Sequence, residues 1–152
     1  MSTKVVAFDL TQRPPRGMRS RLGGYVIFPR VLDKCRALIA GKNGEFNYNC
    51  PLDQHFFRFV GIDPAAFQAQ VATGAGDAAM LDWVQSNTMS KPAPWVIAQW
   101  SAYHEQRGPD SDAETLEYFA TALAKFSQTR EDIRSWADLL DLDDYASFGG
   151  AL

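Results

Sequence analysis

The chain has 152 residues, of which 46% are hydrophobic and 22% charged, and its formal net charge is −3. This length fits one domain, and the composition argues against a disordered or fibrous chain. The longest apolar runs fall far short of the ~20 residues that cross a bilayer, so we expect no membrane partner. The N-terminus lacks the pattern of a secretory signal peptide, which predicts a cytoplasmic protein.

Charge is distributed unevenly along the chain. Residues 1–42 contain nine basic and two acidic residues, whereas residues 43–152 contain six basic and sixteen acidic residues. A basic arm either binds an anionic ligand or nucleic acid, or pairs with acidic residues of the same chain. The acidic total and the lack of a recognised motif argue against nucleic acid, and internal pairing is the simpler explanation.

Residues 1–28 contain the helix-breaking pairs Pro14-Pro15 and Gly23-Gly24. These pairs predict a mostly irregular, extended arm that packs over the body of the protein. The run "VVAFDL", residues 5–10, is at most a short strand without a clear partner.

From Pro29 the spacing of apolar residues becomes helical, and seven helices are expected. Proline in the first turn and glycine after the last turn set several of their limits. The expected helices begin at Pro29, Cys50, Asp63, Asp77, Trp95, Ala113 and Thr129.

Three helix caps are predicted from local sequence. Asp63 is expected to cap the third helix and Asp77 the fourth, while Thr129 and Asp132 resemble a capping box for the seventh. The tail, residues 141–152, looks irregular. The predicted fold is therefore all-α, a single compact domain over residues 1–152 with six or seven helices and an extended N-terminal arm.

Four segments carry a resemblance to a known family. They are "DLTQRPPR" (9–16), "LGGYVIFPRVLDKCRALIAGKNGEFNYNCPLDQHFF" (22–57), "GID" (61–63) and "DLLDLDDYASFGG" (138–150). With these segments the chain resembles, nearly from end to end, a bacterial family known as a domain of unknown function. The resemblance implies membership of that family but no activity.

Cys50 is the most interesting single residue. If Pro51 is the first helical position, Cys50 is the N-cap, where the macrodipole and unpaired amides stabilise an anion. A thiol placed there beside cationic side chains becomes a nucleophile. Asp53 is the other candidate catalytic group, and we expect it to accept a hydrogen bond from the Cys50 amide. The alternative is that Cys50 is a partly buried cap that packs against Phe46 and Tyr48.

The remaining titratable residues give no catalytic or metal motif. Cys35 lies on the apolar stripe of the first helix and is expected in the core as a free thiol. His55 follows Asp53 by two residues, so their side chains project to different sides of one helix. His104 is expected to be buried or half-buried. No CxxC motif or histidine pair supports zinc, and we expect no metal and no cofactor.

Arginine side chains of the basic region can bind carboxylates or phosphates through two parallel hydrogen bonds. The sequence "RLGGY" is neither a Walker loop nor a dinucleotide fingerprint, so no particular ligand is indicated. The alternative docks the arginines on acidic residues of the C-terminal segment. The arginines in question are Arg13, Arg16, Arg19, Arg21 and Arg30, and the acidic residues are Asp138, Asp141, Asp143 and Asp144.

The favoured hypothesis is a polar pocket between residues 13–25 of the arm and the loop 45–53. It would bind a small anionic metabolite, with Cys50 or Asp53 as the reactive group if a reaction occurs. The competing hypothesis is a non-catalytic interaction or structural module whose basic arm pairs with the acidic tail. The predicted ligand-binding residues are Arg13, Arg16, Arg21, Tyr25, Arg30, Glu45, Tyr48 and Asn49.

Overall fold

The computed structural model describes residues 5–110 and 112–152. These residues form a mostly helical domain with one small hairpin, which confirms the predicted all-α class. No described helix is long and apolar enough to cross a membrane. The elements are β1 (Arg21–Leu22), β2 (Tyr25–Val26), α1 (Phe28–Ile39), α2 (Pro51–Val60), α3 (Pro64–Val71), α4 (Asp77–Asn87), α5 (Pro94–Gln106), α6 (Ala113–Ala124) and α7 (Trp136–Ser147).

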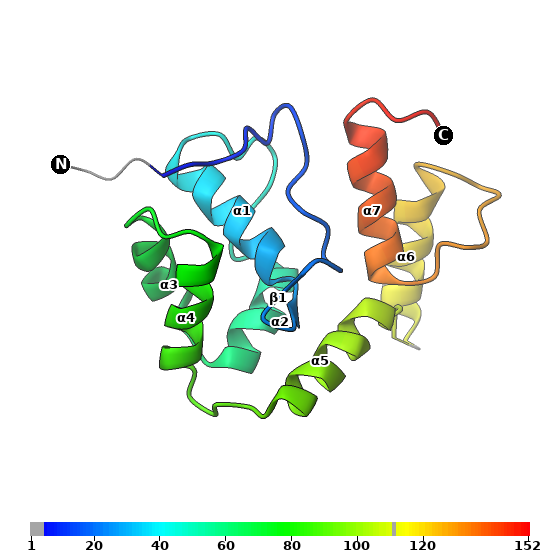
Figure 1. Cartoon of the computed structure of the whole chain (residues 1–152). Helices are drawn as coiled ribbons and strands as arrows, with labels where there is room; N and C mark the ends of the chain where they lie inside the picture. The colour runs from blue at the N-terminus through cyan, green and yellow to red at the C-terminus, as the bar shows by residue number, and fades with distance from the viewer. Residues whose placement is uncertain (1–4, 111) are drawn as a thin grey trace.

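The helices divide into two groups in space. Helices α1 to α4 lie on one side of the molecule and α6 and α7 on the other, and α5 connects the two sides (Figure 1). The N-terminal arm, dark blue in Figure 1, runs over α1 and then descends between α1 and α7 to the hairpin. The arm is therefore in a position to join the two groups.

Local signals set the limits of α2 and α3 as the sequence predicts. Helix α2 begins at Pro51 and ends before Gly61, whose φ of 67° is left-handed. Helix α3 begins at Pro64, and the Asp63 carboxylate accepts a hydrogen bond from the Ala66 amide at 3.3 Å. A proline at the first position loses no helical hydrogen bond, because that amide has no partner within the helix.

Two predicted caps are wrong. Gly76 is the N-cap of α4, and the Asp77 carboxylate instead binds arginine side chains. Helix α7 begins at Trp136 rather than at Thr129, because Ser135 and Asp138 form its capping box with hydrogen bonds of 3.0 and 3.1 Å. Each capping side chain satisfies a first-turn amide, and this fixes where the helix starts.

The acidic tail is also more ordered than predicted. Residues 141–147 belong to α7, and only residues 148–152 lack regular structure. Aspartate has low helix propensity, which made this segment look irregular. In the folded protein, Asp141 and Asp144 form ion pairs with Arg19 and Arg30, and these tertiary contacts outweigh the propensity.

The Gly23-Gly24 pair is the turn of the β1–β2 hairpin. The two glycines have φ values of 59° and 86°, and the strands pair Arg21 with Val26 in antiparallel register. A Cβ atom at Gly23 would collide with the side chain of Leu81 on α4. These glycines therefore permit a tight turn that packs against α4, while residues 5–10 form no strand.

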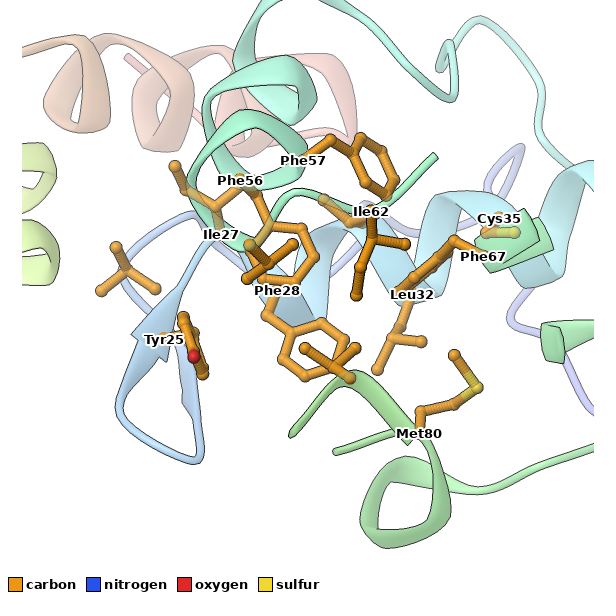
Figure 2. Close-up of a cluster of buried hydrophobic side chains, with 14 of the residues drawn as sticks. Tyr25, Ile27, Phe28, Leu32, Cys35, Phe56, Phe57, Ile62, Phe67 and Met80 are labelled. Atoms are coloured by element: carbon orange, nitrogen blue, oxygen red, sulfur yellow. The ribbon is translucent and has the colours of Figure 1, made fainter. Parts of the chain in front are cut away.

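Aromatic rings pack against one another within the main core, together with aliphatic side chains (Figure 2). The rings of Phe28 and Phe56 stack with their centroids 4.7 Å apart, and the Tyr25 ring meets Phe56 edge-on at 5.9 Å. Burying one such ring contributes roughly 1.5–3 kcal/mol to folding. A smaller cluster between α6 and α7 contains Phe119, Ile133, Leu139 and Leu142.

Candidate functional site

The predicted site residues lie in more than one place. Arg13 and Arg16 line a cavity of about 450 Å³ between the arm, α1 and the start of α4, which we call the arginine cavity. Arg30, Glu45 and Cys50 line a second cavity of about 530 Å³ between the arm, the loop before α2 with the start of that helix, and α7. We call it the thiol cavity.

An ion-pair network fixes one wall of the arginine cavity. The Arg16 guanidinium lies 3.0 Å from Asp33, which is 2% exposed, and 2.8 Å from Asp77. Arg36 binds the second oxygen of Asp77 at 2.8 Å. Burial opposes the charge of Arg16, but hydrogen bonds to Asp77 and Asp33 outweigh it and raise the Arg16 pKa. The Arg16 hydrogen bond, together with that of Arg36, lowers the pKa of Asp77 against the effect of burial.

Arg13 differs from these arginines because it has no carboxylate partner among the described residues. It is exposed, its guanidinium lies 3.8 Å above the centre of the Phe8 ring, and its Nε contacts the Pro14 carbonyl at 3.5 Å. Both terminal nitrogens thus remain available. At the start of α4 the N-cap Gly76 supplies no capping side chain, and the first-turn carboxylate of Asp77 is paired with Arg16 and Arg36.

A buried lysine organises the thiol cavity. The Lys34 ammonium lies 2.8 Å from Asp53 Oδ1, 3.1 Å from the Asn47 carbonyl oxygen and 3.2 Å from Cys50 Sγ. The side chains of Lys34 and Asp53 are 4% and 0% exposed, so the charges compensate each other away from water. The ammonium group thus donates hydrogen bonds to the Asn47 carbonyl and to Cys50 Sγ, and its contact with Asp53 is an ion pair. Lys34 was not among the residues predicted from the sequence.

Cys50 is at the N-cap of α2, as predicted, but the Asp53 carboxylate accepts its hydrogen bond from a different amide than expected. Cys50 is the half-buried N-cap of α2 and has no side-chain capping bond. Asp53 accepts from the amide of Asn49 at 2.9 Å, not from that of Cys50. The structure therefore joins both predicted catalytic residues through Lys34.

The second cation of the thiol cavity is neutralised in the same way. Arg30 lies 2.8 Å from Asp144 and also donates to the Arg16 carbonyl at 3.2 Å. Two further carboxylates line the cavity, those of Glu45 and Asp143, and no described cation lies within ion-pair distance of either. The uncompensated charge in this cavity is therefore negative.

Four predicted ligand-binding residues have structural contacts. Tyr25 is 1% exposed within the aromatic core, where burial raises its pKa. Tyr48 donates to the Pro64 carbonyl at 2.6 Å, and burial raises its pKa as well. Asn49 has a φ of 61° and its amide donates to the Asp53 carboxylate, and Arg21 pairs with Glu105 at 2.7 Å.

The basic arm also contacts the acidic C-terminal segment. Arg19 binds the carboxylates of Asp138 and Asp141 on α7. Burial tends to raise the pKa of Asp138, but hydrogen bonds from Arg19 and from the amides of Arg134 and Ser135 lower it to about 2. The competing hypothesis anticipated this internal pairing. Asp143 was predicted to take part but receives its hydrogen bond from Ser147.

The two histidines, which are far apart in sequence, meet in space. Their ring centroids lie 5.0 Å apart, and the Trp100 ring lies 4.6 Å from His104. Burial, assisted by the nearby His55 and Arg107, lowers the pKa of His104 to about 4. Within residues 5–110 and 112–152, no group of three or more histidine, cysteine and carboxylate side chains is arranged to hold a metal ion.

Comparison with known proteins places the chain in a family. The model of the family described as "Domain of unknown function (DUF5069)" matches residues 12–146, so the chain belongs to this family. The match includes the arm from Gln12 onward, most of the residues that line the two cavities, and most of α7. It leaves out residues 5–8 of the arginine cavity. No curated protein matches the chain.

Proposed function

We propose that this member of the DUF5069 family binds a small anion with an attached apolar group in the arginine cavity. The observation that carries the proposal is the guanidinium of Arg13, which has no carboxylate partner among the described residues. It lies beside two arginines whose positions are fixed by carboxylates. The three arginines and the two aspartates of this cavity leave one net positive charge. Among the predicted ligand-binding residues, Arg13 and Arg16 belong to this site.

The shape of the binding group follows from the free donors. The two terminal nitrogens of Arg13 match the two oxygens of a carboxylate or phosphate. The first amides of α4, next to Gly76, are further donors for an anion. An added Cβ at Gly76 would meet no atom within 4 Å, so the backbone there is accessible.

An apolar group is expected on the ligand because residues 5–8, "VVAF", form part of the cavity wall. Burying apolar surface contributes about 25 cal/mol per Å². Phenyl phosphate should therefore bind more tightly than inorganic phosphate. We propose the bacterial cytoplasm as the setting, consistent with the free thiols of Cys35 and Cys50.

Thermal unfolding in the presence of anions tests the proposal. At a concentration of about ten times Kd, a ligand stabilises the protein by about 1.4 kcal/mol, or a rise in Tm of roughly 3–6 °C. Inorganic phosphate, phenyl phosphate and benzoate should be compared at constant ionic strength. Arg13→Gln should remove most of the rise without lowering Tm in the absence of ligand, and Arg58→Gln on the surface of α2 is the control.

Arg16 is a poor variant for this purpose, because its loss would leave the buried Asp33 without a partner. If no anion raises Tm, or if Arg13→Gln responds like the natural protein, the binding proposal is wrong. That result would favour the second candidate, a structural or interaction module. The ion pairs of Arg19 and Arg30 with α7 are the observation that favours this candidate.

A further inference from the structure

The thiol cavity is separate from the arginine cavity and has a different charge. Cys50 Sγ accepts a hydrogen bond from Lys34 at 3.2 Å, and both residues line the cavity. An ammonium group donates more strongly to a sulfur atom that carries negative charge. The Lys34 ammonium also forms an ion pair with the buried Asp53. The thiol therefore belongs to a cluster of three interacting side chains and is not an isolated cysteine.

The chemistry of the cavity walls favours a cationic ligand. Arg30 and Lys34 are neutralised by Asp144 and Asp53, whereas Glu45 and Asp143 retain uncompensated charge. The rings of Phe46 and Phe148 also line the cavity and stack with their centroids 6.2 Å apart. The Arg30 guanidinium already lies 5.7 Å from the centre of the Phe46 ring. The two uncompensated carboxylates are therefore the groups that attract an ammonium group.

We propose that the thiol cavity is a covalent site, in which Cys50 is the nucleophile for a small electrophile that carries a cationic amine. This site is additional to the proposed anion site and requires a ligand of the opposite charge. Glu45 and Asp143 hold the amine, and Lys34 holds the sulfur.

The covalent step is a substitution at the electrophilic atom. The thiol releases its proton to solvent, and the thiolate sulfur supplies the electron pair of the new bond. The bond from the electrophilic atom to its leaving group breaks, and that group departs with the electron pair of the broken bond. Atoms and electrons therefore balance without an external oxidant or reductant.

Three methanethiosulfonates that differ only in their tails test both the reactivity and the charge preference. The 2-aminoethyl reagent is cationic, the 2-sulfonatoethyl reagent anionic and the methyl reagent neutral. Each transfers its thioalkyl group to a cysteine and releases methanesulfinate. Rates at pH 7 are measured by intact mass and divided by the rates of the same reagents with 2-mercaptoethanol.

After this normalisation, the cationic reagent should react at least ~10-fold faster than the anionic reagent, since opposite charge favours encounter and like charge opposes it. The double variant Glu45→Gln, Asp143→Asn should abolish most of this preference. The double variant Glu114→Gln, Glu117→Gln on α6 makes the same change in net charge outside the cavity and should keep the preference. Cys50→Ser should not be modified under native conditions.

The proposed amine site would be overturned by a normalised rate ratio of cationic to anionic reagent near one. It would also be overturned if the double variant Glu45→Gln, Asp143→Asn kept the ratio of the natural protein. If the methyl reagent reacts with Cys50 more than tenfold slower than with 2-mercaptoethanol, Cys50 is not the proposed nucleophile. Failure here is distinct from failure of the anion site. Cys50→Ser should retain the rise in Tm with phenyl phosphate, and Arg13→Gln should retain the reagent preference.

Discussion

Arg30 on α1 and Asp144 on α7 form an ion pair of 2.8 Å across 114 residues of sequence. Their side chains are only 4% and 13% exposed, so the pair is largely shielded from water. Arg30 also donates to the Arg16 carbonyl of the arm. This contact thus joins the arm and the two groups of helices at one point.

Asp144→Asn should lower the free energy of unfolding, because it leaves Arg30 charged and buried without a carboxylate. Removing one partner of a buried pair costs about 3–5 kcal/mol, and we expect about 2–4 kcal/mol here because Asp144 retains some exposure. Urea unfolding measures the change. Asp143→Asn is the matched control, and a loss below about 0.5 kcal/mol for Asp144→Asn would contradict this role.

Stability should fall as the pH drops from about 6.5 to 4, because His104 resists protonation in the folded state. Its folded pKa of about 4 lies below the ordinary value of 6.5, so only the unfolded state gains a proton in this range. One such group makes the free energy of unfolding fall by up to about 1.4 kcal/mol per pH unit. Its full contribution to stability is present above pH 6.5. His55 has a lowered pKa too and acts in the same direction.

His104→Phe tests this pH dependence. The Nδ1 atom of His104 is buried without a hydrogen-bond partner among the described residues, so a phenyl ring removes no satisfied polar contact. Between pH 7 and 5, the free energy of unfolding of the variant should fall by about 2 kcal/mol less than that of the natural protein. Urea unfolding at the two pH values gives the comparison. Equal losses in both proteins would show that His104 is not the titrating group.

Gly23→Ala and Gly41→Ala should separate backbone strain from steric collision. Both glycines have positive φ, 59° and 69°, so an alanine at either costs about 1–2 kcal/mol. A Cβ at Gly41 meets nothing within 4 Å, whereas one at Gly23 collides with Leu81. Gly23→Ala should therefore be the more destabilising variant in thermal unfolding. Equal effects would mean that Leu81 can move aside.

Much of the fold follows from local sequence because local interactions determine it. Proline at the start of α2 and glycine at its end act within a few residues, and so does the Asp63 cap of α3. The start of α7 could not be predicted as securely. Thr129–Asp132 and Ser135–Asp138 have the same spacing, and only tertiary packing selects the second.

The candidate sites depend on contacts between distant segments, which limits prediction from sequence. Cys50 was found because an N-cap is a local feature. Lys34 was missed because its place next to Cys35 in the sequence does not indicate that this side of α1 is buried in the folded protein. Its buried position, and the meeting of His55 with His104, require packing of elements that are far apart in sequence. The one available signal was that Arg30 and Lys34 lie one turn apart at the edge of the apolar stripe.

Isothermal titration of the natural protein and of Arg13→Gln with phenyl phosphate tests the central claim most directly. We predict saturable 1:1 binding to the natural protein and to Arg58→Gln, with at least a ~10-fold weaker Kd for Arg13→Gln, which corresponds to about 1.4 kcal/mol. Equal affinity in all three proteins, or no binding to any of them, would contradict a ligand site at the arginine cavity.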